Sequence, residues 1–427
     1  MQGSLGRIKL LLKLKGNKVK ILFVFCCWLV LSVTQTSYAH EAHHMPSDLA
    51  ISTVFDKAGN LWRVQVKQDF VEVSFSKDLG KAFSKGVRVN KTPHNIRPMG
   101  EVRPKIAVGP TGAIFVTWTQ HLKARFSSYV WFSRSLDAGK TFEAPYIVHQ
   151  DRAEIGHAYD DLSISPNGDV TVLWLDARDL VAAKSQGKQH LGTSVYYTAS
   201  VDQGKSFTAE KKLADASCEC CRIATTIKPD GTVVALWRHV FEGNERDHMM
   251  AEVPSSHVVS PDNKVPEIHR ATFGHWVIDG CPHHGAAIAS GGEGKDWWGY
   301  HMAYFDGNDK TKAGSGLYYS RMDGVAWSSS VPKKFGDSKK QASHPAIMSA
   351  GEKVWLVWRE TEAKNNTIMG MFSDDGGRNW SDTKALATTT DKADYPQLLA
   401  NTKNTQKYLV WNTAKDGMKV IDLSNIF

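Results

Sequence analysis

The sequence is poor in cysteine and lacks long helical patterns. Only six of its 427 residues are cysteines, and Cys26 and Cys27 lie in an apolar run near the start. A small, disulfide-dense scaffold is therefore excluded. No segment repeats apolar residues at the 3.6-residue helical period over several turns, which argues against a helical bundle. Short apolar runs broken by glycine, asparagine, aspartate and proline are typical of β-strands joined by turns, so we predict an all-β fold.

Acidic residues are absent from the first 39 positions, which contain six basic residues. An apolar run over residues 21–33 follows, and then the sequence Ser37-Tyr38-Ala39. This order is typical of a secretory signal peptide, because the apolar run is too short to span a bilayer. We predict cleavage after Ala39 and an exported protein, periplasmic or secreted. An uncleaved anchor is the alternative.

Most of the positive charge belongs to this leader. The whole chain carries a net charge of +8, from 52 basic and 44 acidic residues. Without the leader, 46 basic and 44 acidic residues remain, which is a net charge of +2. The mature chain therefore gives no reason to expect a nucleic-acid partner. We expect a monomer without a stable membrane anchor.

A histidine-rich segment opens the mature chain, and we predict a mobile tail over residues 40–50. It contains His40, His43 and His44. An amino-terminal histidine can chelate copper through its amine and its ring, although such tails are more often only solvated. The rest of the chain, residues 51–427, is predicted to be one β domain.

An eight-residue repeat, Ser-x-Asp-x-Gly-x-x-aromatic, recurs along this domain. Its serine and aspartate oxygens can accept backbone hydrogen bonds and its glycine can take a positive φ, which suits a hairpin turn. The copies are Ser76–Phe83, Ser135–Phe142, Ser200–Phe207, Ser373–Trp380 and, in degenerate form, Ser320–Trp327.

This repeat is the Asp box, and the chain resembles the sialidase-like Asp-box (BNR repeat) β-propellers as a divergent member. In that family the motif is structural and lies on the outer rim, so the resemblance implies a fold and not an activity. Strands that end in tryptophan supply the blade count, with Trp markers at positions 118, 174, 237, 298, 358 and 411. Six markers predict a six-bladed β-propeller of the sialidase type.

The innermost strand of each blade lines a central channel, and its first residues form the mouth where ligands usually bind. Counting back from each Trp marker places six short segments at this mouth. They are Arg103-Pro104, Asp160-Asp161, Cys221-Arg222, His283-His284-Gly285, His344-Pro345 and Tyr395-Pro396.

Four cysteines remain after the leader, in the motifs Cys218-Glu219-Cys220-Cys221 and Cys281-Pro282-His283-His284. Because successive blades carry these motifs, we expect them to be neighbours at the mouth. Thiolate and imidazole ligands together suit copper, with zinc as the alternative. The predicted metal ligands are Cys218, Cys220, Cys221, Cys281, His283, His284 and His344, with Arg222 beside them.

Other interpretations of the cysteines stay open. In an oxidising compartment they also suit structural disulfides, in which case no cofactor is expected. Bridges within the Cys218–Cys221 run close small, strained rings, so a bridge from the run to Cys281 is easier. A redox-active pair is a third possibility. The triplet His248-Met249-Met250 has a similar composition but also fits simple strand packing.

The family resemblance implies an enzymatic alternative, exo-α-sialidase-type glycoside hydrolysis. Sialidases grip a carboxylate with three arginines and use a Tyr–Glu nucleophile with an aspartic acid/base. The matching positions here are Tyr395, Asp161 or Asp160, Arg103 and Arg222. The usual Arg-Ile-Pro signature is absent, and the mouth segments supply no third arginine. Sugar cleavage is therefore not the preferred interpretation.

A third class is a non-catalytic, protein-binding platform with structural disulfides. The preferred interpretation remains a propeller that handles a soft metal, or assembles in a metal-dependent way, with a protein or metal-delivery partner.

Overall fold

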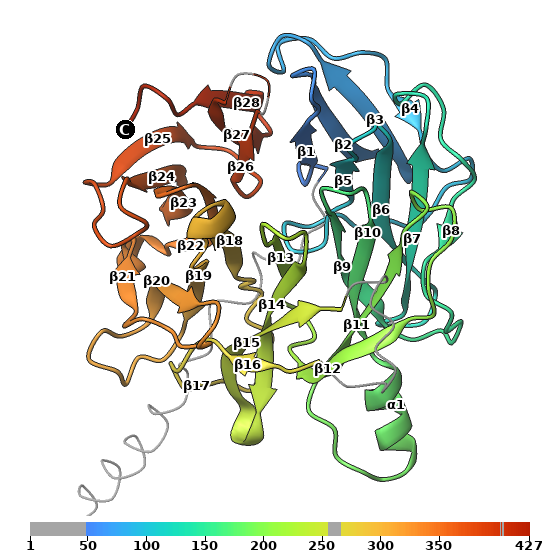
Figure 1. Cartoon of the computed structure of the whole chain (residues 1–427). Coiled ribbons are helices and arrows are strands. Elements are labelled where there is room, and N and C mark those ends of the chain that lie inside the picture. Colours follow the sequence, from blue (N-terminus) through green and yellow to red (C-terminus); the bar gives the residue numbers. More distant parts are fainter. Residues whose placement is uncertain (1–47, 255–265, 402, 404) are drawn as a thin grey trace, which may run out of the picture. The chain divides into compact units, whose positions relative to one another are not determined.

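The computed structural model describes residues 48–254, 266–401, 403 and 405–427 (Figure 1). They belong to one compact unit, Met45–Phe427. The predicted signal peptide, 1–39, and the histidine-rich tail up to residue 47 lie outside the described residues. The end of that tail is packed, because Ala50 is buried and the Leu49 carbonyl accepts a 2.9 Å hydrogen bond from Asn412 Nδ2. No helix among the described residues is long and apolar enough to cross a membrane.

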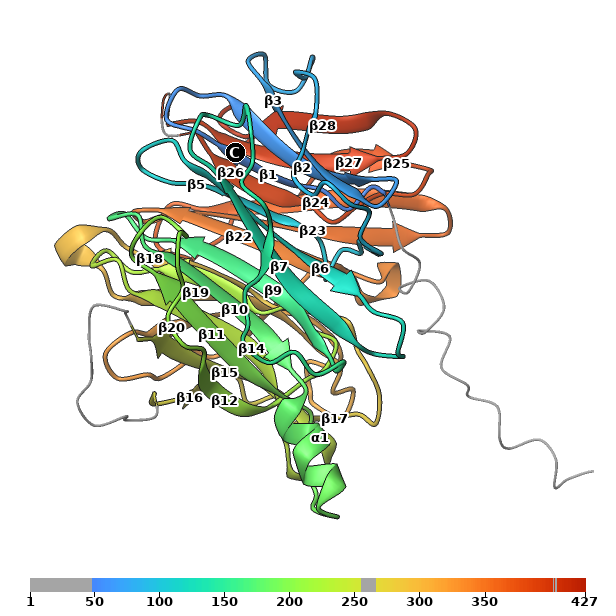
Figure 2. The ribbon, with the colours of Figure 1, turned by 90° about the vertical axis from the view of Figure 1, so that its right-hand side faces the viewer.

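Antiparallel strands make up nearly all of this unit, in successive meanders (Figures 1 and 2). The first three meanders are β1 (Ser52–Phe55), β2 (Leu61–Lys67), β3 (Phe70–Ser76) and β4 (Val87–Arg88); β5 (Lys105–Val108), β6 (Ile114–His121), β7 (Ser128–Ser135) and β8 (Tyr146–Ile147); and β9 (His157–Ile164), β10 (Val170–Asp176), β11 (Thr193–Ser200) and β12 (Lys211–Ser217). The helix α1 (Arg178–Ser185) lies between β10 and β11.

The later meanders follow the same plan, with short 3-10 turns η1 (Glu242–Asn244), η2 (Gly294–Asp296) and η3 (Ser338–Lys340) in their connections. Their strands are β13 (Ala224–Ile227), β14 (Val233–Phe241), β15 (Glu245–Val253), β16 (His269–Arg270) and β17 (Trp276–Val277); β18 (Ala287–Gly291), β19 (Gly299–Asp306), β20 (Gly316–Asp323) and β21 (Lys333–Phe335); β22 (Ser343–Ala350), β23 (Lys353–Glu362), β24 (Asn365–Ser373) and β25 (Lys384–Thr389); and β26 (Gln397–Ala400), β27 (Lys407–Thr413) and β28 (Gly417–Asp422).

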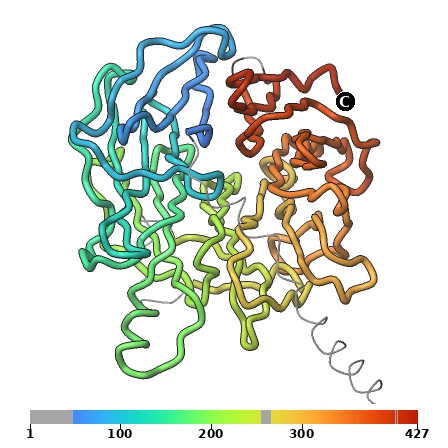
Figure 3. The backbone as a smooth tube through the Cα atoms, turned by 180° about the vertical axis from the view of Figure 1, so that it is seen from behind, coloured from blue at the N-terminus to red at the C-terminus, as the bar shows by residue number. Residues whose placement is uncertain are grey.

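The first strands of these meanders follow one another in a closed ring. In chain order β1, β5, β9, β13, β18, β22 and β26 each contact the next, and β26 contacts β1. Figure 3 shows the first and last meanders, blue and red, beside each other. The third and fourth meanders are also joined edge to edge by a pairing of Ser217 with His239, which makes one nine-stranded sheet.

The described residues therefore form seven meanders, and the predicted count of six blades is not confirmed. Five Trp markers lie on the second strands of their meanders. The second strand of the first meander has no tryptophan at the matching position. Leu61 of β2 and Ile114 of β6 occupy matching positions, because each pairs with the serine that ends the following strand. Gln65 then stands where Trp118 stands in the second meander, so a count of tryptophans misses the first one.

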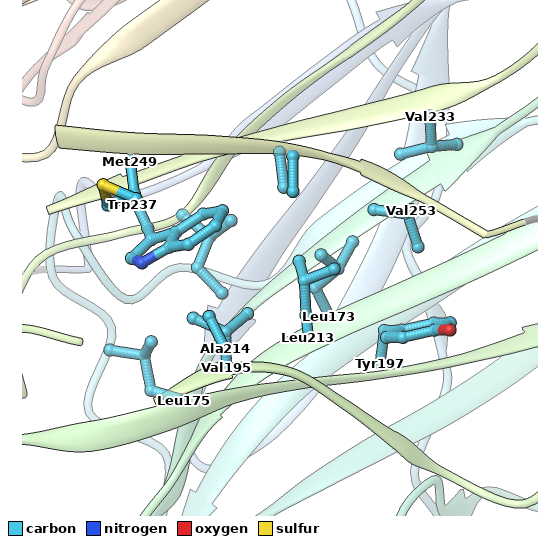
Figure 4. Close-up of a cluster of buried hydrophobic side chains, with 13 residues drawn as sticks. Leu173, Leu175, Val195, Tyr197, Leu213, Ala214, Val233, Trp237, Met249 and Val253 are labelled. Carbon is cyan, nitrogen blue, oxygen red and sulfur yellow. The ribbon is translucent and has the colours of Figure 1, made fainter. Parts of the chain in front are cut away.

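Apolar side chains from neighbouring meanders form the core. Figure 4 shows the cluster between the third and fourth meanders, where Trp237 and Met249 lie close to Leu175 and Val195. Burying a side chain of this size contributes about 1.5–3 kcal/mol relative to leaving it exposed. Trp118, Trp174, Trp358 and Trp411 are buried in the same way on other second strands. Trp298 is only half-buried and precedes its strand, where Tyr300 of β19 is the buried aromatic residue.

The Ser-x-Asp-x-Gly repeats form turns between third and fourth strands. In the second meander Ser135 Oγ donates to Asp137 at 2.8 Å and accepts from the Gly139 N–H at 2.9 Å. Hydrogen bonds from Thr141 and Ser135 hold the pKa of Asp137 at about 2. Gly139 has φ +76°, and a Cβ there would stand 2.6 Å from the Trp62 ring of the previous meander. The turn therefore packs against its neighbour through a position that only glycine fits.

Candidate functional site

Three buried thiols meet where the chain passes from the third meander to the fourth. The loop after β12 begins with Cys218, whose N–H donates to the Arg238 carbonyl of β14 at 2.8 Å. The sulfur of Cys218 lies 3.7 Å from that of Cys220 and 3.5 Å from that of Cys221. Their three sulfur atoms all lie within 4.8 Å of one another. We call Cys218, Cys220 and Cys221 the inner group.

A second group shares one sulfur with the first. Cys281 and His283 come from the loop between β17 and β18, and each offers a ligand atom within 4.8 Å of the Cys220 sulfur and of the other. His283 is buried and has φ +50°, whereas Cys281 is exposed. A non-glycine residue at positive φ is uncommon and often marks a functional site. We call Cys220, Cys281 and His283 the outer group.

Two of the predicted ligands do not join either group among the described residues. The His284 ring stacks on Phe305 with centroids 4.1 Å apart, and the His344 ring stacks on Tyr395 at 3.6 Å. These two histidine rings lie 5.2 Å from each other. The two groups thus contain the four cysteines and His283, and His284 and His344 stay predicted ligands outside them.

The geometry of the thiols fits a soft metal ion. Four sulfurs around a tetrahedral ion with bonds of about 2.3 Å lie about 3.8 Å apart, close to the sulfur separations in the inner group. The structure contains no disulfide bond between the four cysteines that it describes. Hydrogen bonding with Cys220 and Cys221 lowers the pKa of Cys218 well below its usual range, whereas hydrogen bonding with Cys218, Cys221 and Cys281 raises the pKa of Cys220. Burial raises the pKa of Cys221 to about 11. Hydrogen bonding with Cys220 also lowers the pKa of Cys281, so thiolates are favoured at Cys218 and Cys281, and further ionisation requires a cation.

A buried arginine lies beside the inner group. Arg238 is 2% exposed, and its Nη2 donates to the carbonyls of His284 at 3.0 Å and Phe305 at 2.8 Å. No acidic side chain in the described part of the chain forms an ion pair with it. Its charge contributes to the lowered pKa of Cys218. A buried cation without a carboxylate is costly, and a thiolate cluster is a suitable counter-ion.

One carboxylate holds both ligand loops in place. Glu101 is buried and accepts hydrogen bonds from the Arg222 N–H at 3.0 Å, from Arg222 Nη1 at 2.8 Å and from the Gly285 N–H at 2.9 Å. Arg222 follows Cys221, and Gly285 follows His284. A Cβ on Gly285 would stand 2.5 Å from the Glu101 carboxylate and 2.2 Å from the Arg222 side chain. Sequence patterns missed Glu101 because it precedes β5 outside every repeat.

Next to these loops, the starts of the inner strands surround a pocket of about 310 Å³, which we call the mouth pocket. Predicted mouth residues from five segments line it: Arg103, Asp161, Arg222, His344 and Tyr395. Asp160, predicted beside Asp161, accepts instead from the hydroxyls of Thr117 and Thr119 in the neighbouring meander. Asp161 accepts a 2.6 Å hydrogen bond from the Thr225 hydroxyl.

Two arginines close to Tyr395 differ in their partners: Arg103 lines the mouth pocket, and Arg359 is not part of its lining. Arg103 is committed to a bidentate ion pair with Asp394, at 2.7 and 2.8 Å, and to the Ile51 carbonyl. Arg359, on the second strand β23, lies with its guanidinium carbon 5.1 Å from the Tyr395 ring centroid. Its Nε has no hydrogen-bond partner in the described part of the chain. The mouth segments omitted Arg359 because only inner strands were counted.

Charged side chains surround Tyr395. Burial raises its pKa to about 12, and the charge of Glu101 adds to the effect while Arg359, Arg103 and Arg222 oppose it. A Cβ on Gly100 would stand 1.9 Å from its ring, so the ring lies directly against the backbone of that loop. The Tyr395 hydroxyl is therefore held protonated at neutral pH.

The remaining candidate residues have packing and ion-pair roles. His248 and Met250 of β15 are buried, and the His248 N–H donates to the Thr272 hydroxyl at 2.8 Å, as strand packing requires. Glu245, Asp247 and His275 also lie close together, but Arg270 forms ion pairs with both carboxylates and occupies the centre of that group.

No protein-family model and no curated protein matches the chain. Solved structures do match it. The polysaccharide lyase Uly1 is 10% identical with a TM-score of 0.56, covering 92% of this chain and 94% of that one. A polysaccharide lyase of family PL25, an ulvan lyase bound to -[GlcA(1-4)Rha3S]-, is 11% identical with a TM-score of 0.52, covering 88% and 94%. The Hadza microbial sialidase Hz136 is 12% identical with a TM-score of 0.46, covering 86% and 73%. At such identities the lyase likenesses show the fold alone, which is a β-propeller.

Glu101→Gln tests the carboxylate that joins the two ligand loops. The amide keeps the shape but loses the charge, and it turns an N–H₂ group toward backbone and guanidinium donors. We expect the free energy of unfolding to fall by about 2–4 kcal/mol, measured by urea denaturation. The matched control is Glu143→Gln, whose half-exposed carboxylate pairs with Arg134 at 2.9 Å and should cost less than about 1 kcal/mol. Equal losses in the two variants would contradict the role of Glu101.

Proposed function

We propose that this protein is an exported, sialidase-like propeller of the Asp-box type that binds a soft transition metal, copper first and zinc second. The ligands are Cys218, Cys220, Cys221, Cys281 and His283, at the place where the third and fourth meanders join. The observation that carries the proposal is the convergence of four thiols and one imidazole from two loops 60 residues apart in sequence.

The surroundings of the cluster support this function. Burial of three thiols excludes the competing oxygen ligands of solvent, and sulfur donors favour a soft ion such as copper(I). The buried guanidinium of Arg238 offsets the negative charge that several thiolates bring to one ion. Glu101 fixes both loops before any ion arrives, which lowers the entropic cost of assembling the ligands.

Metal handling or metal-dependent assembly is the role that suits such a site. The inner group is buried, whereas the exposed Cys281 gives a partner access to the cluster. A protein or a metal-delivery partner could therefore exchange an ion at this edge.

Metal analysis of protein exported to a bacterial periplasm tests the proposal. We expect copper or zinc to remain bound through gel filtration, and Cys220→Ala to lose most of it, because this thiol belongs to both groups. His275→Ala, an exposed histidine of the Glu245–Asp247 group, is the control and should retain the metal. Protein without metal and without titratable thiols after denaturation would contradict the proposal and favour structural disulfides.

A second candidate function belongs to the mouth pocket, which gathers a tyrosine, a histidine and arginines around a cavity. Arg222 lines the pocket and is paired with Glu101, Arg359 lies next to the Tyr395 ring, and Asp161 is an acidic residue of the lining. This set favours a sialidase-type glycoside hydrolase as the enzymatic alternative, with Arg359 as the arginine that the mouth segments lacked.

A fluorogenic sialoside assay tests this alternative. If Tyr395 is the nucleophile, Tyr395→Phe should lower turnover by at least about 100-fold with little change in stability. Tyr129→Phe, whose hydroxyl donates only to the Arg152 carbonyl at the surface, is the control and should stay fully active. Absence of turnover in the unaltered protein, or unchanged turnover in Tyr395→Phe, would reject the hydrolase.

A further inference from the structure

The inner and outer groups differ sharply in their access to solvent. Cys218, Cys220 and Cys221 are 2%, 3% and 1% exposed, whereas Cys281 of the outer group is exposed. A hydrated or chelated ion cannot reach three buried sulfurs at once without first losing its ligands. It can reach Cys281, and from there the sulfur of Cys220 lies within 4.8 Å.

We infer that the cluster consists of two metal subsites that share Cys220, and that a copper(I) ion enters at the outer group and moves to the inner group. This inference rests on the proposed metal-binding function and adds a route and an order to it. The outer group supplies two sulfurs and one nitrogen, and the inner group supplies three sulfurs.

During the transfer the ion exchanges two of its three ligands and keeps the third. The bond from the ion to Cys220 is kept, the bonds to Cys281 and His283 break, and bonds to Cys218 and Cys221 form. Cys218 binds as a thiolate, and the proton of Cys221 passes to Cys281, so no proton is gained or lost in the transfer. No electron is transferred, and the ion keeps three ligands throughout.

A site of three thiolates suits copper(I) better than it suits zinc. Zinc in closed structural sites takes four ligands, so it would need Cys281 together with the inner group. Arg238 sets the geometry of both positions, because its carbonyl accepts from the Cys218 N–H and its guanidinium donates to the His284 carbonyl. Its charge, buried near the inner group, favours the three-thiolate position once an ion is there.

Transfer of copper(I) from its bathocuproine disulfonate complex to the reduced, metal-free protein tests the two subsites. We expect Cys281→Ala and His283→Ala to slow capture about tenfold or more while the final copper content is kept. Cys218→Ala should capture copper(I) at the unaltered rate, but the chelator should extract it about tenfold faster than from the unaltered protein. Circular dichroism and melting temperature establish that each variant is folded, and Cys281→Ser provides a second outer variant.

Two results would overturn the inference. Capture at the unaltered rate by Cys281→Ala, His283→Ala and Cys281→Ser would show that the outer group plays no part in loading. Loss of all copper(I) from folded Cys281→Ala at equilibrium would show one four-ligand site instead of two subsites. Failure of the unaltered, fully reduced protein to bind copper(I) would instead refute the proposed function itself, so the two failures are distinguishable.

Discussion

The buried carboxylate of Glu101 is the interaction on which the functional region depends. It accepts three hydrogen bonds from two loops that belong to different meanders, and it lies itself in a third. A buried charge is stable only when such donors surround it, so the loops and the carboxylate fix one another. The thiols of one loop and the imidazole and thiol of the other are thereby held within ligand distance. Gly285 is part of the same constraint, because a side chain there would separate the loops.

The same interaction connects two chemically distinct places. Arg222 follows the last thiol of the inner group and also lines the mouth pocket, where it donates to the Pro345 carbonyl at 3.2 Å. On the other side His284 stacks close to His344, which stacks on Tyr395. Packed side chains therefore connect the thiol loops with the mouth pocket.

Much of this arrangement was predictable from the sequence. Short apolar runs broken by turn residues indicated an all-β chain, and the nearly constant distance from the start of an inner strand to its Trp marker placed Arg222, His344 and Tyr395 at one opening. The blade count failed because Gln65 replaces a tryptophan in the first meander. His344, like His283, has a positive φ, so the direction of its ring does not follow from its place in a strand. Glu101 and Arg359 lie outside the segments that were counted back from the Trp markers. Only the closed ring of first strands brings these two residues close to the mouth pocket.

X-ray absorption at the metal edge of the protein as purified from the periplasm tests the central claim most directly. A cluster of four thiols and one imidazole predicts a first shell dominated by sulfur, at about 2.3 Å from the ion. It also predicts that this shell loses sulfur in Cys220→Ala. A first shell made only of nitrogen or oxygen, at about 2.0 Å, would contradict the account, because it would place the metal away from the thiols.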